Sequence, residues 1–172
     1  PEVFFNWHGG EPLLAGLDFY RKAMTFQRKY AAGKKIRNTL QTNATLITRE
    51  WAEFFRANGF LIGVSLDGPQ KVHDAYRGGK AGASVFDRVL RGITELYRAG
   101  VQYNVMATVN KQSEGRAMEV YQFLKSAGTR FIQFMPVVEH VKNGLIVSPD
   151  TPGARLAPWS VSAAGFGRFL CD

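Results

Sequence analysis

Short apolar runs of strand length alternate along the chain with longer stretches of helical periodicity. The apolar runs lie near residues 3–8, 36–43, 60–66, 101–109 and 131–136. Each of the first four is followed by a stretch with an apolar stripe at helical spacing, as at Val89, Ile93 and Leu96. Because strands joined by helical crossovers lie parallel, the pattern predicts a parallel sheet. That sheet is either open and doubly wound or a piece of a β/α barrel.

The two faces of each predicted strand differ in polarity. In the run near residues 60–66, Ile62 and Val64 share one face, while Gly63 and Ser65 share the other. A sheet covered by helices on both faces would be almost continuously apolar, and buried polar groups without partners cost about 1–3 kcal/mol each. We therefore expect an α/β fold that is a partial (β/α) TIM-like barrel fragment, with parallel strands, helices on the outer face and a wet concave face. The polar residues expected on the concave face are Asn6, His8, Thr39, Gln41, Asn43, Ser65, Asp67, Gln102, Asn104, Thr108 and Asn110.

The chain of 172 residues has about the length of one domain. Its periodicity fades from about Val137 onward, into a segment with several glycines and prolines. Apolar residues return at Phe166, Phe169 and Leu170, where a helix is expected to begin. We predict that residues 1–140 form the central part of the barrel, and that residues 141–172 form a long loop and the truncated start of a C-terminal region.

Composition and charge exclude some partners. Lys and Arg number 22 against 14 Asp and Glu, a formal net charge of +8 that favours anionic partners. These basic residues are scattered along helix faces without a nucleic-acid motif, so we expect no nucleic-acid partner. The longest apolar stretches are far shorter than the roughly 20 residues of a membrane helix, so we expect no membrane partner.

One cysteine and three histidines limit the metal chemistry of the chain. The single Cys171 excludes an internal disulfide, a Cys-rich zinc site and an iron-sulfur cluster held by this chain alone. The histidines, His8, His73 and His140, lack the spacing of a helical metal pair. We therefore predict no metal site, and a reducing, cytoplasmic setting is the default.

Candidate site residues follow the predicted strands, because ligands of parallel β/α sheets bind at the carboxyl ends of the strands. Gly9, Gly10, Glu11 and Pro12 follow the first strand. The glycines permit close backbone approach, and the carboxylate can accept a hydrogen bond from an ammonium group. The alternative is a simple glycine turn, with Glu11 favourably near a helix N-terminus.

The next two strands also end in polar residues. Gln41 and Asn43 close the second strand, and Ser65 closes the third. The Ser65 hydroxyl can donate to a carboxylate or ribose oxygen, and Arg77, twelve residues later, can bind the same anion. The alternatives are ordinary turn chemistry for Asn43 and a solvated loop position for Arg77.

In this order the segments resemble the radical SAM superfamily, specifically the anaerobic sulfatase maturases. The resemblance runs from Val3 to about Glu139. It lies in Trp7-His8-Gly9-Gly10-Glu11-Pro12, in Leu40-Gln41-Thr42-Asn43, in Val64-Ser65-Leu66-Asp67-Gly68-Pro69 with His73 and Arg77, and in Ile132-Gln133-Phe134-Met135-Pro136. The combination is far more specific than any of its parts.

The resemblance implies a partial β/α barrel that is open on one side. It also implies S-adenosylmethionine and a [4Fe-4S] cluster as cofactors, and radical oxidation of a sulfatase Cys or Ser to formylglycine. By position, Gly9, Gly10, Glu11 and Pro12 would hold the methionyl amino group, Ser65 and Arg77 the carboxylate and ribose region, the backbone near Val138 the adenine, and His8, Gln41 and Asn43 the substrate peptide.

The sequence departs from this family in three ways. The cluster-binding Cys-x3-Cys-x2-Cys loop is absent and is expected before Pro1, while the proton acceptor and the cysteine-rich auxiliary domain are expected beyond Asp172. Ala44 also stands where relatives often have glycine. We therefore expect no catalytic residue in this chain and an inactive isolated segment, with an unpaired apolar edge at each end of the sheet. A maturase of ribosomally made peptides and a non-catalytic S-adenosylmethionine-binding module are the alternatives; the sequence gives no oligomeric state.

Overall fold

The main sheet has five parallel strands that lie side by side in chain order. The computed structural model describes residues 1–79 and 82–172. The strands are β1 (Glu2–Trp7), β2 (Lys35–Thr42), β3 (Leu61–Ser65), β4 (Gln102–Val109) and β5 (Ile132–Pro136). Every neighbouring pair is parallel. The structure therefore confirms all five predicted strands, with ends shifted by one residue at most.

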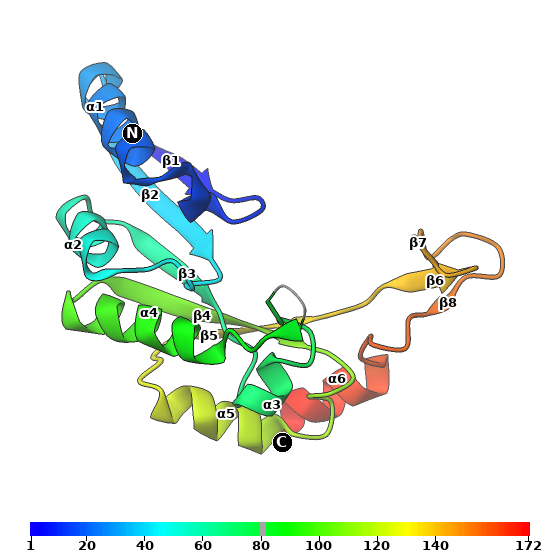
Figure 1. Ribbon diagram of the computed structural model, residues 1–172. Helices are drawn as coiled ribbons and strands as arrows, with labels where there is room; N and C mark the ends of the chain where they lie inside the picture. The colour runs from blue at the N-terminus through cyan, green and yellow to red at the C-terminus, as the bar shows by residue number, and fades with distance from the viewer. Residues whose placement is uncertain (80–81) are drawn as a thin grey trace.

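Helices follow the strands and cover one side of the sheet. Figure 1 shows the sheet curling, with the four longer crossover helices along its outer side. These are α1 (Leu17–Tyr30), α2 (Arg49–Ala57), α4 (Phe86–Arg98) and α5 (Ala117–Ser126). Two short elements, the 3-10 helix η1 (Pro12–Ala15) and the helix α3 (Gln70–His73), follow β1 and β3 directly. Each of these helical turns begins at the carboxyl end of a strand.

The hydrophobic core lies between the sheet and these helices. Ile62 and Val64 of β3 are fully buried there, together with Phe55 of α2 and Leu96 of α4. Burial of side chains of this size stabilises the fold by about 1.5–3 kcal/mol each. The opposite face of β3, with Gly63 and Ser65, is only half-buried. This difference confirms the predicted curved sheet with a polar concave face.

The segment after β5 differs from the expected long loop. It forms a small antiparallel sheet that projects from the main body in Figure 1. Its strands are β6 (His140–Lys142), β7 (Leu145–Val147) and β8 (Arg155–Leu156), in the order β7-β6-β8. The prediction of a loop was wrong because strands of two or three residues are too short to show periodicity. The turn Asn143-Gly144, with φ values of 52° and 77°, is the signal that predicts such a hairpin.

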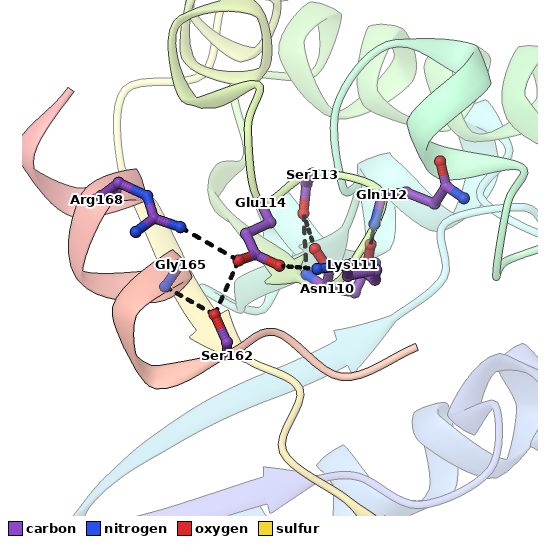
Figure 2. Close-up of polar contacts among 8 residues, drawn as sticks. All are labelled: Asn110, Lys111, Gln112, Ser113, Glu114, Ser162, Gly165 and Arg168. Carbon is purple, nitrogen blue, oxygen red and sulfur yellow. Dashed lines mark hydrogen bonds and ion pairs between the residues drawn. The ribbon is translucent and has the colours of Figure 1, made fainter. Parts of the chain in front are cut away.

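The chain ends in the helix α6 (Ala163–Cys171), which confirms the helix expected there. Figure 2 shows how its first turn is fixed to the loop after β4. Glu114 of that loop accepts a hydrogen bond from the Ser162 hydroxyl at 2.8 Å and from Lys111 Nζ at 2.9 Å. Ser162 in turn caps α6 by accepting from the Gly165 N–H at 2.9 Å. Among the described residues, no helix is long and apolar enough to cross a membrane.

Candidate functional site

The turn after β1 is held in a backbone conformation that favours glycine. Gly9 and Gly10 have φ values of 96° and 52°, in the region that residues with a Cβ rarely adopt. His8, just before them, is exposed, and its Nδ1 accepts a hydrogen bond from the Gly9 N–H at 2.9 Å. The turn therefore presents exposed backbone groups at the carboxyl end of β1.

Glu11 ties this turn to the end of β2. Its Oε1 accepts hydrogen bonds from the Leu13 N–H at 3.1 Å and from the Thr42 hydroxyl at 2.7 Å. Its Oε2 accepts from the Asn43 N–H at 2.9 Å. A carboxylate offers about four lone-pair sites, so about one acceptor site remains on Oε2. The alternative from the sequence, a carboxylate at a helix N-terminus, is thus correct in part, since Glu11 caps η1.

The same turn is also held from the core side. The Tyr20 hydroxyl donates a hydrogen bond to the Pro12 carbonyl at 3.1 Å. Burial raises the pKa of Tyr20 to about 12, and the nearby Glu11 charge adds to this shift. The phenol therefore stays a neutral donor, and Pro12 is fixed by a buried side chain.

At the end of β2, Asn43 and Ala44 form a tight turn. Asn43 Oδ1 accepts from the Thr45 N–H at 3.0 Å and from the Thr45 hydroxyl at 2.7 Å. This is the local turn chemistry that the sequence left open as an alternative. Ala44 is fully buried and has a φ of 60°, so it takes the left-handed conformation that glycine adopts in this position without strain.

Gln41 and Ser65 meet on the concave face. Gln41 Nε2 donates a hydrogen bond to Ser65 Oγ at 3.1 Å. The register aligns Gln41 with Gly63 and Gly63 with Asn104 across three strands. A Cβ on Gly63 would overlap Gln41 Oε1, so the glycine leaves the space in which the Gln41 amide lies. The structure therefore brings together side chains that the alternation in sequence had only assigned to one face.

Arg77 is paired with a buried carboxylate. Its Nε lies 2.6 Å from Asp67 Oδ2, and the Asp67 side chain is 1% exposed. Asp67 Oδ1 accepts from the Thr108 N–H at 2.7 Å. The alternative of a solvated loop arginine is therefore wrong, because the Arg77 side chain is 28% exposed and held by Asp67. Asp67 was assigned to the polar face from the sequence, but its pairing with Arg77 was missed.

His73 lies in the core beside this pair. Its Nδ1 accepts from the Asp67 N–H at 3.4 Å, and its Nε2 has no hydrogen-bond partner among the described residues. Burial lowers the pKa of His73, an effect that Arg77 reinforces and the charge of Asp67 opposes. The imidazole is therefore neutral near pH 7, and it supports the loop after β3.

Val138 lies between two backbone connections after β5. The Val137 N–H donates to the Val109 carbonyl at 2.8 Å, and the Val161 N–H donates to the Val137 carbonyl at 3.0 Å. On the other side, the Glu139 N–H donates to Ser160 Oγ at 2.9 Å. Val138 itself is exposed. The segment is thus fixed beside the carboxyl end of β4, at the same edge of the sheet as Asn43 and Arg77.

The chain matches the family model described as the Radical SAM superfamily over residues 3–124. This chain belongs to the radical SAM superfamily. The matched residues run from β1 through most of α5, so they include all four strand ends from β1 to β4.

Relatives of this radical SAM chain are named as sulfatase maturases. It is 46% identical over 176 residues to a "Serine-type anaerobic sulfatase-maturating enzyme" of Bacteroides thetaiotaomicron, which covers 99% of this chain and 42% of the relative. It is 38% identical over 140 residues to a "Cysteine-type anaerobic sulfatase-maturating enzyme" of Clostridium novyi, covering 81% of this chain and 37% of the relative. The chain thus spans about two fifths of the length of these relatives.

A solved structure has the same fold. It is described as "Native anSMEcpe with bound AdoMet and Cp18Cys peptide" and is 32% identical, with a TM-score of 0.86 over 98% of this chain and 45% of that one. This likeness confirms the partial β/α barrel as the fold of the radical SAM chain.

The cluster of this superfamily does not fit the thiols of the chain. Cys171 is the single cysteine, and it is exposed on α6 at the far end of the sequence. Among residues 1–79 and 82–172, no group of three His, Cys, Asp or Glu side chains is arranged to hold a metal ion. With one cysteine, the radical SAM chain cannot supply three thiolates, so its described residues hold no ligand set for such a cluster.

Proposed function

We propose that this chain is the central, S-adenosylmethionine-binding part of a protein-modifying oxidoreductase of the sulfatase-maturase type. The activity would convert a Cys or Ser side chain of a sulfatase peptide to formylglycine. Two findings support the proposal: membership of the radical SAM superfamily, and the names of relatives of both the serine and the cysteine type. The AdoMet and Cys peptide named with the solved relative support the same cofactor and substrate class.

The polar concave face at the carboxyl ends of the strands is the observation on which the proposal rests. Four of its groups suit the parts of an amino-acid nucleotide. The glycine turn offers exposed backbone carbonyls to an ammonium group, and Glu11 retains acceptor capacity beside them. Ser65 and Arg77 offer a hydroxyl and a guanidinium to a carboxylate or ribose oxygen. Reduced by one electron from the [4Fe-4S] cluster implied for the full-length protein, a bound S-adenosylmethionine would supply a carbon-centred radical able to remove a hydrogen atom from the substrate.

The remaining site residues are assigned to adenine and peptide. Val138 is exposed and its neighbours are fixed on both sides, so its backbone groups suit hydrogen bonds to a flat base. His8, Gln41 and Asn43 lie beside the cofactor groups on β1 and β2, and in our proposal they contact the substrate peptide. Among the described residues, His8 Nε2, Gln41 Oε1 and Asn43 Nδ2 have no hydrogen-bond partner. The bonds of these side chains use the other polar atom of each, namely His8 Nδ1, Gln41 Nε2 and Asn43 Oδ1.

The test uses the full-length protein that contains this chain, reconstituted anaerobically with iron and sulfide. It is incubated with S-adenosylmethionine, a reductant and a sulfatase peptide that carries either Ser or Cys at the modified position. The expected product is an aldehyde, which mass spectrometry detects as the loss of two hydrogen atoms from Ser or the exchange of SH and H for oxygen in Cys.

Other products separate the alternatives. A cross-linked or otherwise modified ribosomal peptide without an aldehyde would favour the peptide-maturase function. Binding of S-adenosylmethionine without modification of any peptide would favour the binding module. Failure to bind S-adenosylmethionine at all would overturn the proposed function.

A further inference from the structure

Asp67 is a buried charge at the carboxyl end of β3. Its side chain is 1% exposed, two residues after Ser65. A carboxylate that leaves water needs compensating partners, because the loss of hydration is expensive in a protein interior. The groups around Asp67 show how its charge is compensated.

Both carboxylate oxygens of Asp67 are engaged, one with a strand and one with the loop after α3. Oδ1 accepts from the Thr108 N–H of β4 at 2.7 Å, and Oδ2 lies 2.6 Å from Arg77 Nε. The backbone N–H of Asp67 donates to the imidazole of His73 at 3.4 Å. The carboxylate is therefore fixed relative to β4, while the backbone of Asp67 is tied to α3, and the carboxylate can hold the guanidinium in one orientation.

That orientation leaves the outer donors of Arg77 free. The contact with Asp67 uses the Nε–H, while within residues 1–79 and 82–172 neither Nη atom donates to another protein group. A guanidinium has five N–H donors, so up to four remain. The Arg77 side chain is 28% exposed, which makes these donors accessible from solvent.

Ser65 supplies a further donor close by. Its Oγ accepts from Gln41 Nε2, so its own proton is available for donation. One residue separates Ser65 from Asp67, which limits the distance between their Cα atoms to about 7 Å. Because Arg77 is paired with Asp67, the hydroxyl and the guanidinium both belong to the carboxyl end of β3, and each is a donor that suits a carboxylate.

We propose that Asp67 is a positioning residue that orients Arg77 toward the carboxylate of the bound cofactor. The proposal rests on the proposed function, since it assumes that S-adenosylmethionine binds at this strand end. Asp67 contributes its charge and its two fixed hydrogen bonds, and touches no cofactor atom itself. Asp67 therefore affects only the binding of the cofactor's carboxylate, and it does so through Arg77.

The test compares two ligands in the full-length protein. Affinities for S-adenosylmethionine and for its decarboxylated analogue are measured by equilibrium dialysis for the parent protein, Asp67→Asn, Arg77→Ala and the double variant. Asp67→Asn is expected to lower the affinity for S-adenosylmethionine roughly ten- to hundredfold, the range for the loss of a hydrogen bond to a charged group. Binding of the decarboxylated analogue is expected to change less than about twofold, and the double variant is expected to bind no worse than Arg77→Ala.

A matched control is Glu53→Gln, which breaks an ion pair between a carboxylate and an arginine on the outer face. In that pair, Glu53 Oε1 lies 2.7 Å from Arg49 Nε. Its affinities for both ligands are expected to stay unchanged. If Asp67→Asn does not fold, Arg77→Lys is used, because it keeps a cation for Asp67 and removes the planar fork; a selective loss of S-adenosylmethionine binding is again expected.

Equal losses for the two ligands would overturn the positioning role and leave the proposed function intact. A double variant that loses the product of the two single effects would overturn the action through Arg77. A parent protein that binds neither ligand would overturn the proposed function, and the inference with it.

Discussion

The carboxylate of Glu11 lies 2.7 Å from the hydroxyl of Thr42, on the neighbouring strand and 31 residues away in the sequence. The Thr42 hydroxyl, the Leu13 N–H and the Asn43 N–H all donate hydrogen bonds to this carboxylate. Glu11 therefore links the loops after two strands, whatever further ligand its remaining lone pair accepts. The glycine turn keeps its position relative to β2 through this one side chain.

Glu11→Ala is expected to lower the free energy of unfolding by about 1–3 kcal/mol, because three donors lose their acceptor. Urea denaturation followed by circular dichroism measures the change. The control is Glu2→Ala at the other end of β1, where an exposed pair with Arg37 at 3.2 Å should contribute about 0–1 kcal/mol. Equal losses in the two variants would contradict the linking role of Glu11.

Gly63→Ala is expected to displace the Gln41 amide, since the new Cβ would overlap Gln41 Oε1. The hydrogen bond to Ser65 would be lost, which costs about 0.5–1.5 kcal/mol. Adding Gln41→Ala should remove the conflict, so the two effects on unfolding should not add. Gly115→Ala, where the space is open, is the control. Additive effects would show that Gly63 does not make room for Gln41.

Glu114 is expected to make stability depend on acid pH. The hydrogen bond from Lys111, and then that from Ser162, lower the pKa of Glu114 below its ordinary value of 4.5. The unfolded chain thus takes up a proton at a higher pH than the folded chain. The contribution of Glu114 to the free energy of unfolding is complete above pH 4.5, and it is lost as the pH falls through the lower pKa of Glu114 in the folded chain.

Chemical denaturation between pH 3 and pH 7 tests this expectation. Glu114→Gln should flatten the acid part of the stability profile, while Glu119→Gln, at an exposed position of α5, should leave it unchanged. A profile for Glu114→Gln that runs parallel to the parent profile would contradict the assignment.

His73 is expected to act in a second pH window. Because burial lowers its pKa from 6.5, the unfolded chain binds a proton below that pH while the folded chain does not. Stability should therefore decline as the pH falls from 6.5 toward the lower folded value. His73→Gln should remove this decline, as measured by thermal unfolding, and His140→Gln in the small sheet should retain it. A decline of the same size in both variants would rule out His73 as its source.

The sequence predicts the main sheet well because its strands are long enough to show which face is buried. Ile62 and Val64 alternate with Gly63 and Ser65, and that alternation alone identified the concave face. The small sheet at residues 140–156 was missed, although Asn143-Gly144 pointed to a hairpin. Strands of two or three residues give no period, so only the turn could have been used.

The partners of the site residues could not be predicted in the same way. Asp67 reaches the Thr108 N–H across 41 residues, and Glu11 reaches Thr42 across 31. Such contacts depend on register between strands and on the helices in between, which the local pattern does not determine. The sequence therefore predicted which residues lie near the site, whereas their hydrogen bonds had to come from the structure.

Strand order in the main sheet is identical to chain order. During synthesis, each new strand emerges when the strand that it must join has already been made. The sheet can thus form during synthesis, one strand and its helix at a time, because each strand pairs with the strand made just before it.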